Sequence, residues 1–228
     1  MSFDPASAAG LVAREVRSGF RDGAATKITI ARRVYPVGQA DLWDALTSAD
    51  RIPRWFLPVS GDLRVGGRYQ TEGNAGGVIE RCAEPESFAV TWEFGGTLSW
   101  LGVTLTRDGD RTVLELAHEA PVTPDLWGTY GPGAVGVGWD LALIALGRYL
   151  DTGTPADPQR AAAFPLSPDG KAFVRTAAEG WAAAAIADGD DPETAQQAAA
   201  RTAAFYSGPP AGGTGPDSDS HSGTRTGQ

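Results

Sequence analysis

The spacing of apolar residues changes along the chain, and each change predicts a different element. Between residues 6 and 21, apolar side chains recur at near-helical spacing with charged residues between them, which predicts a short amphipathic helix. Over residues 26–34 they fall at every second position, which predicts a half-buried strand. The stripe formed by Leu42, Trp43 and Leu46 then predicts a helix over residues 40–46.

Residues 61–119 alternate between apolar and polar positions, with glycine-containing or proline-containing turns every 8–12 residues. This pattern predicts consecutive antiparallel strands joined by hairpins. Phe88, Val90, Trp92 and Phe94 share one face of a strand, and Leu114, Leu116 and His118 share one face of another. We therefore expect an antiparallel sheet with one dry and one solvated face.

The helical period returns after Pro132 and continues to Thr152, which predicts an apolar helix of about 20 residues. Only this helix is apolar enough to cover the dry face of the sheet, so we expect it to lie there. Ser167-Pro168 and Asp191-Pro192 are typical helix starts. They predict two more helices, with thin apolar faces, that pair with each other and dock on the main domain.

Composition divides the 228 residues into a core-forming part and two flanks. Residues 26–152 contain 33 of the 44 Leu, Ile, Val and Phe residues and six of the seven tryptophans, whereas the flanks are rich in Ala, Gly and Pro. The last segment has almost no apolar side chains and is predicted to be disordered. We expect an N-terminal amphipathic helix over 1–25, a cored α+β domain over 26–153, an alanine-rich helical extension over 154–206 and a disordered tail over 207–228.

Charge and targeting signals exclude several classes of protein. The net charge is −9, the pI is about 4.7 and no run of basic residues is present, which argues against a nucleic-acid partner. The N-terminus lacks the apolar stretch of a signal peptide, and no segment resembles a membrane span. We expect a cytoplasmic protein without a membrane partner.

Few residues are suited to catalysis or metal binding. The single cysteine, Cys82, excludes an intrachain disulfide and is expected to be structural. His118 falls on an apolar face, where a hydrogen-bonded core histidine is more common than a base; Glu80 and Glu119 are the nearby carboxylates. The sequence offers no cluster of metal ligands and indicates no cofactor.

Residues 131–136 match the pattern G-x-G-x-x-G of dinucleotide-binding loops. The match lacks the βαβ context that such a loop requires, because no buried strand leads directly into it and none follows the helix. We expect instead that these glycines let the long helix approach the sheet or a ligand closely.

Aromatic side chains are more abundant than a single interface between a sheet and a helix needs. Trp43 is expected to be ordinary core, but the remaining rings favour an aromatic-lined hollow between the sheet and the long helix. The candidate ligand-binding residues are Trp55, Phe56, Trp92, Trp100, His118, Trp127 and Trp139.

Several short motifs, in order, resemble the START-like (SRPBCC) superfamily over residues 26–152. They are Ile28-Thr-Ile-Ala-Arg-Arg-Val-Tyr-Pro-Val, Asp41-Leu-Trp-Asp-Ala-Leu-Thr, Arg54-Trp-Phe, Gly66-Gly-Arg-Tyr, Gly77-Val-Ile-Glu, Thr91-Trp, Thr112-Val-Leu-Glu-Leu-Ala-His and Gly138-Trp. The chain is most similar to the branch named after the activator of Hsp90 ATPase homologue. The resemblance implies a helix-grip fold, in which a curved antiparallel sheet wraps around a long C-terminal helix and encloses a cavity for an apolar ligand.

Three functions remain open from the sequence. The first is non-catalytic binding of a small hydrophobic or aromatic molecule, with His118 as a polar contact. The second is an enzyme of the cyclase or hydrolase kind, using His118 with a carboxylate and a water molecule; the scarcity of catalytic groups argues against it. The third is a co-chaperone-like interaction module that uses residues 154–206 as a partner surface, in which case residues 1–153 should fold without it.

Overall fold

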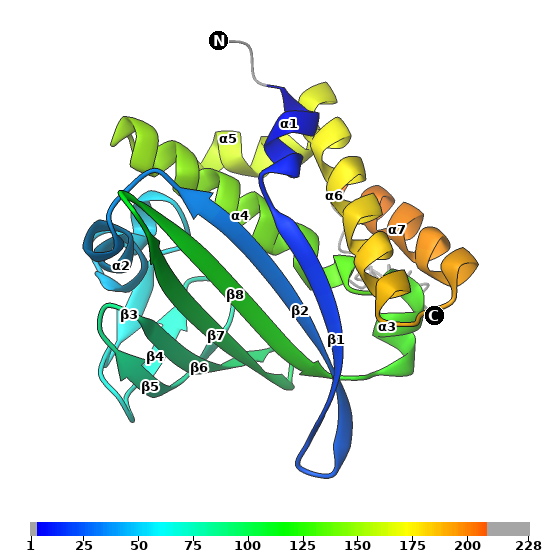
Figure 1. Cartoon of the computed structure of the whole chain (residues 1–228), viewed down its shortest axis with the longest axis horizontal. Helices are drawn as coiled ribbons and strands as arrows, with labels where there is room; N and C mark the ends of the chain where they lie inside the picture. The colour runs from blue at the N-terminus through cyan, green and yellow to red at the C-terminus, as the bar shows by residue number, and fades with distance from the viewer. Residues whose placement is uncertain (1–3, 209–228) are drawn as a thin grey trace, which may run out of the picture.

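The computed structural model describes residues 4–208, apart from the side chains of residues 124 and 125. One antiparallel sheet of eight strands, in the order β1-β2-β8-β7-β6-β5-β4-β3, curves around the long helix α4 (Figure 1). This confirms the predicted α+β helix-grip fold. The elements are α1 (Pro5–Gly10), β1 (Ala13–Arg21), β2 (Ala24–Tyr35), α2 (Gln39–Thr47), η1 (Ile52–Arg54), β3 (Val59–Gly61), β4 (Arg68–Thr71), β5 (Gly76–Ala83), β6 (Ser87–Phe94), β7 (Thr97–Asp108), β8 (Arg111–Pro121), α3 (Pro124–Tyr130), α4 (Gly133–Thr152), α5 (Pro158–Ala163), η2 (Phe164–Leu166), α6 (Pro168–Ala187) and α7 (Pro192–Ser207).

The central strands follow the predicted alternation. The pairs Leu101↔His118, Val103↔Leu116 and Leu105↔Leu114 join β7 to β8, and all six side chains are buried. Because successive residues of a strand point to opposite faces, Trp100 and Glu119, which also pair, lie on the outer face. The register therefore decides which of the candidate residues face α4.

Helix α4 spans the 20 residues expected of it and ends at Gly153, whose φ of 67° is left-handed. Val137, Leu143 and Leu146 on this helix are fully or almost fully buried. By length and composition α4 could cross a membrane, since its mean hydropathy is 1.2. However, 61% of it is buried inside the fold, as is usual for the core helix of a globular domain.

The predicted N-terminal helix over residues 6–21 is wrong for most of its length. Only α1 is helical, and residues 13–21 form β1, the edge strand that pairs with β2. Val12, Val16 and Phe20 are four residues apart, a spacing that fits a helix but also places all three on one face of a strand. The hairpin turn, with positive φ at both Asp22 and Gly23, decides between the two by joining β1 to β2.

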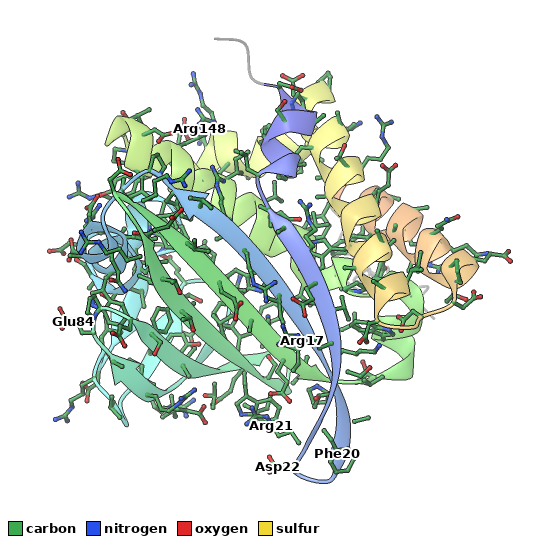
Figure 2. All side chains as sticks on the ribbon, viewed as in Figure 1. Arg17, Phe20, Arg21, Asp22, Glu84 and Arg148 are labelled. Atoms are coloured by element: carbon green, nitrogen blue, oxygen red, sulfur yellow. The ribbon has the colours of Figure 1, made fainter. Side chains whose placement is uncertain are left out.

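Figure 2 shows Phe20, Arg21 and Asp22 at the projecting end of this hairpin. The segment 1–25 is therefore not a separate helical unit, because its second half belongs to the sheet.

The helical extension forms as predicted and is part of the core. Helices α6 and α7 pair with each other, and α6 also packs against α1, β1 and α4. Phe173, Val174 and Trp181 on α6 are fully or almost fully buried. The short helix α5 was not predicted. The predicted disorder of the tail concerns residues that, from 209 onward, lie outside the described part of the chain.

The glycines of the G-x-G-x-x-G segment make room for the extension. A Cβ atom on Gly136 would lie 2.3 Å from the Trp181 ring, and one on Gly133 would lie 2.9 Å from Thr202. The expected close approach is therefore present, but its partners are α6 and α7 and not the sheet or a ligand.

Candidate functional site

Six rings from five parts of the chain pack together between the sheet and α4. Trp139 of α4 lies 5.1 Å from Trp92 of β6, 5.9 Å from His118 of β8 and 6.2 Å from Phe56, measured between ring centroids. Its ring is nearly parallel to that of Phe56. We call this group the aromatic cluster; its members are Trp55, Phe56, Tyr69, Trp92, His118 and Trp139.

His118 is held by a directed chain of hydrogen bonds. Trp139 Nε1 donates to His118 Nδ1 at 3.0 Å, so a neutral imidazole must carry its proton on Nε2. His118 Nε2 lies 2.8 Å from Ser99 Oγ, and Ser99 donates in turn to the carbonyl of Trp92. Sequence reasoning missed Ser99, although alternation along β7 places it on the same face as Leu101.

Burial lowers the pKa of His118 to about 4, so the ring is neutral near pH 7. Both ring nitrogens already have partners, and neither partner is a carboxylate. A general base needs a free lone pair within reach of the proton it takes, and here the Nδ1 lone pair accepts from Trp139. In this arrangement His118 is a neutral side chain, hydrogen-bonded at both ring nitrogens and packed among aromatic rings.

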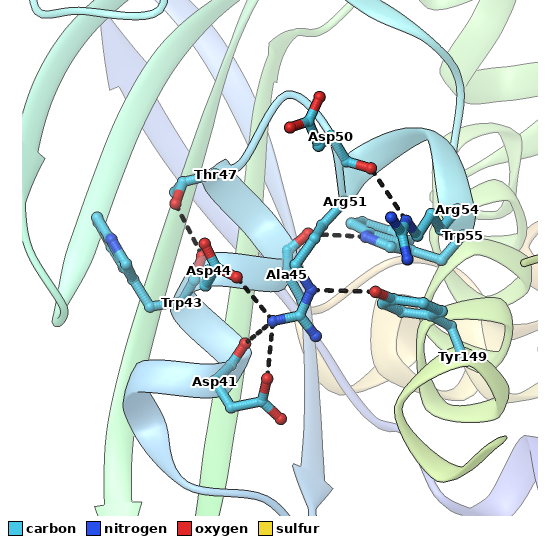
Figure 3. Close-up of polar contacts among 10 residues, drawn as sticks. All are labelled: Asp41, Trp43, Asp44, Ala45, Thr47, Asp50, Arg51, Arg54, Trp55 and Tyr149. Carbon is cyan, nitrogen blue, oxygen red and sulfur yellow. Dashed lines mark hydrogen bonds and ion pairs between the residues drawn. The ribbon is translucent and has the colours of Figure 1, made fainter. Parts of the chain in front are cut away.

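The segment that carries Trp55 and Phe56 is fixed to both α2 and α4 (Figure 3). Arg51 forms ion pairs with Asp41 and Asp44 and donates to the hydroxyl of Tyr149 at 3.1 Å. Burial alone would lower the pKa of Arg51, but its hydrogen bonds to these carboxylates outweigh burial and raise it. Trp55 Nε1 donates to the carbonyl of Ala45, so this ring is also fixed in place (Figure 3).

A cavity of about 30 Å³ lies against His118 on the α3 side. Its volume suits one water molecule, whereas sites for drug-sized ligands measure ~300–1,000 Å³. A larger hollow, of about 620 Å³, lies between α6 and α7 and touches no residue of the aromatic cluster. The small cavity is lined by Lys27, Thr29, His118, Ala120, Pro121, Thr123, Leu126, Trp127, Gly131, Ala134 and Val135.

The structure brings five of the seven candidate residues into the aromatic cluster and separates the other two from it. Trp100 was expected to line the hollow, but it lies on the outer face with the Arg21 guanidinium 4.4 Å from its ring centroid. Trp127 lies on α3 and lines the small cavity without joining the cluster. Trp43, expected to be ordinary core, is buried, which confirms that prediction.

The other candidate catalytic groups lie elsewhere. Glu119 accepts hydrogen bonds from Arg21 and Thr26 on the outer face, and the Arg21 bond lowers its pKa. Cys82 is exposed on β5, so it does not contribute to core packing as a structural thiol would. Within residues 4–208, no three His, Cys, Asp or Glu side chains gather as a metal site.

Residues 37–151, about half of the chain, match the family described as "Activator of Hsp90 ATPase homolog 1-like protein". The chain belongs to this family. Two structures of CalU16 from Micromonospora echinospora agree: the crystal structure is 29% identical with a TM-score of 0.61, and the solution structure is 31% identical with a TM-score of 0.65. Both alignments cover 78% of this chain, and they cover 99% and 96% of CalU16.

DynU16, a protein from the dynemicin biosynthetic locus, shares the fold at 22% identity with a TM-score of 0.50. That alignment covers 56% of this chain and 48% of DynU16. A comparison with curated proteins found no significant match.

The family match places part of the candidate site within the family's own domain. The whole aromatic cluster lies within residues 37–151, whereas β1, β2 and the helical extension lie outside this range. The CalU16 alignments cover more of this chain than the family match does. This family member therefore combines the shared domain with further elements packed against it.

Proposed function

We propose that this protein binds a small, uncharged, mainly aromatic molecule between the sheet and α4, beside His118. The observation that carries the proposal is that His118 belongs both to the aromatic cluster and to the wall of the small cavity. A ligand there would meet the rings of Trp127 and His118 within a mainly apolar lining, the composition typical of small-molecule sites.

The cavity must enlarge before such a ligand fits. Its inner side consists of sheet residues such as Thr29 and Ala120, which are held by strand pairing. Its outer side consists of α3 and the start of α4, including Leu126, Trp127 and Val135. Movement of α3 therefore provides the space, because the opposite wall belongs to the sheet.

Catalysis receives less support than binding. An enzyme of the cyclase or hydrolase kind would need a carboxylate or an activated water at His118, and both ring nitrogens are occupied by Ser99 and Trp139. The aromatic rings and the neutral imidazole instead support recognition without turnover.

Binding can be tested with the uncharged fluorophore N-phenyl-1-naphthylamine, whose emission rises in apolar surroundings. We expect saturable binding to the wild-type protein. The variant Ala120→Leu fills the small cavity and should weaken binding by about tenfold or more, equivalent to ~1.4 kcal/mol. Fluorescence titration measures both affinities, and circular dichroism verifies that the variant is folded.

Trp100→Phe is the matched control, because Trp100 lies on the outer face and should leave the affinity unchanged. The proposal is wrong if the wild-type protein does not bind the fluorophore. It is equally wrong if the cavity-filled variant binds as tightly as the wild type.

A further inference from the structure

The turn between α6 and α7 forms hydrogen bonds with residues that line the small cavity. Lys27 Nζ donates to Asp188 at 2.6 Å and to Asp190 at 2.9 Å. Trp127 Nε1 donates to the other oxygen of Asp190 at 2.9 Å. Asp188 also accepts from the backbone and the hydroxyl of Ser18. Two carboxylates of one turn thus connect β1, β2 and α3.

Two of these contacts involve residues that close the cavity beside His118. Lys27 and Trp127 both line it, and the Lys27 ammonium lies 5.2 Å from the centre of the Trp127 ring. Asp190 binds both of them, one through each carboxylate oxygen. Asp190 therefore links the α6–α7 turn to β2 and to α3 at the wall of the cavity.

Helix α7 holds the other end of α3. Arg201 donates to the carbonyls of Gly128 and Thr129, and Thr202 donates to the carbonyl of Tyr130. The main packing partners of α3 are α7 and the start of α4. Gly131, with a φ of 56°, separates α3 from α4 in a left-handed backbone conformation that glycine adopts without strain.

We propose that the α6–α7 turn is a latch that holds α3 closed over the small cavity, so that the helical extension controls entry to the space beside His118. The role of the latch in ligand entry rests on the proposed function, whereas the closure of α3 does not.

The ion pair between Asp188 and Lys27 favours the charged form of both side chains. Burial alone would raise the pKa of Asp188, but hydrogen bonds from Lys27 and Ser18 outweigh it and lower the pKa. Burial alone would likewise lower the pKa of Lys27, and the bonds to Asp188 and Asp190 reverse this. Charge-assisted hydrogen bonds of this kind are stronger than neutral ones, which suits a contact that must hold a short helix in place.

Hydrogen exchange of the full chain tests the closure without any ligand. We expect Asp190→Ala, which removes the bonds to Lys27 and Trp127, to speed amide exchange over residues 124–131 by about tenfold. Trp127→Phe keeps an aromatic side chain but removes the indole N–H that donates to Asp190, and it should give a smaller increase in the same segment. Mass spectrometry of peptides from this segment and from α7 measures both effects.

Glu193→Ala is the matched control. It removes one negative charge from the start of α7, where the side chain accepts a hydrogen bond from Gln197, and it should leave exchange over 124–131 unchanged. Unchanged exchange in Asp190→Ala would overturn the latch. So would an equal rise over α7, because that would show general loosening of the extension.

Stopped-flow mixing with N-phenyl-1-naphthylamine tests the route of entry. In Asp190→Ala we expect the association rate and the affinity each to rise by up to about tenfold, because the ligand fits the enlarged cavity and the latch no longer opposes its opening. Rates equal to the wild type would overturn control of entry by the latch. If the fluorophore does not bind even the wild type, the proposed function fails, and the exchange experiment still decides whether the latch closes α3.

Discussion

At the scale of residues, burial shifts the pKa of two side chains in opposite directions. It lowers the pKa of His118 to about 4, and it raises that of Asp140 to about 6 against the opposing charge and hydrogen bond of Arg14. Asp140 is fully buried on α4, accepts from Arg14 and Trp181 through one oxygen, and has no partner for the other. Each shift makes the stability of the fold depend on pH.

Between about pH 4 and 6, His118 and Asp140 change the stability of the fold in opposite directions as the pH varies. The unfolded chain binds a proton at His118 more tightly than the folded protein does, so this contribution to stability is lost as the pH falls from about 6.5 toward 4. The folded protein binds a proton at Asp140 more tightly, so that contribution is present at low pH and is lost as the pH rises through about 6.

Asp140→Asn should remove the pH dependence of stability that Asp140 causes and leave that of His118 in place. We expect the free energy of unfolding of the wild type, minus that of Asp140→Asn, to decrease by on the order of 2–3 kcal/mol between pH 4 and pH 7. Urea unfolding of both proteins across this range measures the difference. A difference that increases with pH would contradict the raised pKa.

Asp191→Asn provides a contrast, because hydrogen bonds from Thr194 lower the pKa of Asp191 at the start of α7. For this exposed residue, the free energy of unfolding of the wild type minus that of Asp191→Asn should increase with pH. An equal slope in both variants would mean that the effect of Asp140 does not arise from its burial.

Sequence reasoning at this scale found His118 but not Asp140. Alternation along β8 was enough to place His118 on the apolar face. Asp140 lies within an apolar helix, and its partner Arg14 was assigned to the wrong kind of element, so nothing in the sequence connected the two.

At the scale of elements, α4 is covered on two sides. The sequence predicted one apolar stripe that faces the sheet, and the structure confirms it. The other side carries glycines where α6 and α7 approach: Gly133 faces Thr202, and Gly136 faces Trp181. Spacing predicted close packing here but could not identify the partner, because any helix or sheet can fill a groove of glycines.

Gly136→Ala should destabilise the protein. Its Cβ would lie 2.3 Å from the rigid, fully buried Trp181 ring, so α4 and α6 would have to separate. We expect a loss of ~1–3 kcal/mol, as for other overpacked cores, measured by urea unfolding.

Gly128→Ala is the control for this prediction. Gly128 lies in α3, and an added Cβ would meet nothing within 4 Å, so the substitution should leave stability unchanged or raise it by up to ~1 kcal/mol. Equal effects of the two substitutions would show that α4 and α6 are not in tight contact at Gly136.

At the scale of the whole molecule, the extension completes the core. Helix α6 packs against β1 and α4, its Phe173 and Trp181 are buried, and Trp181 donates a hydrogen bond to the buried Asp140. If the extension were only a partner surface, as one of the three hypotheses from the sequence held, residues 1–153 should fold without it. The packing leads to the opposite expectation, because removal of α6 would expose this side of α4 to water.

A chain ending at residue 153 should therefore not show the cooperative unfolding of the full protein. Exposed apolar surface should make it bind 8-anilinonaphthalene-1-sulfonate and aggregate on heating. A chain ending at residue 208 is the control and should unfold like the full protein. A cooperative transition in the 153-residue chain, at the same urea concentration as in the full protein, would contradict this prediction.

Local sequence patterns were enough to predict the antiparallel strands within residues 61–119, the long helix, the two helices of the extension and the inward position of His118. These follow from the period of apolar side chains and from helix-start residues, which depend on local geometry alone, whereas the helix-grip arrangement was implied by the resemblance to the START-like superfamily. Tertiary structure decided that residues 13–21 form an edge strand, that Trp100 faces outward and that the extension fills the glycine face of α4. It also decided that the α6–α7 turn reaches Lys27 and Trp127. These features depend on register and on contacts between residues far apart in the chain, which local periodicity does not encode.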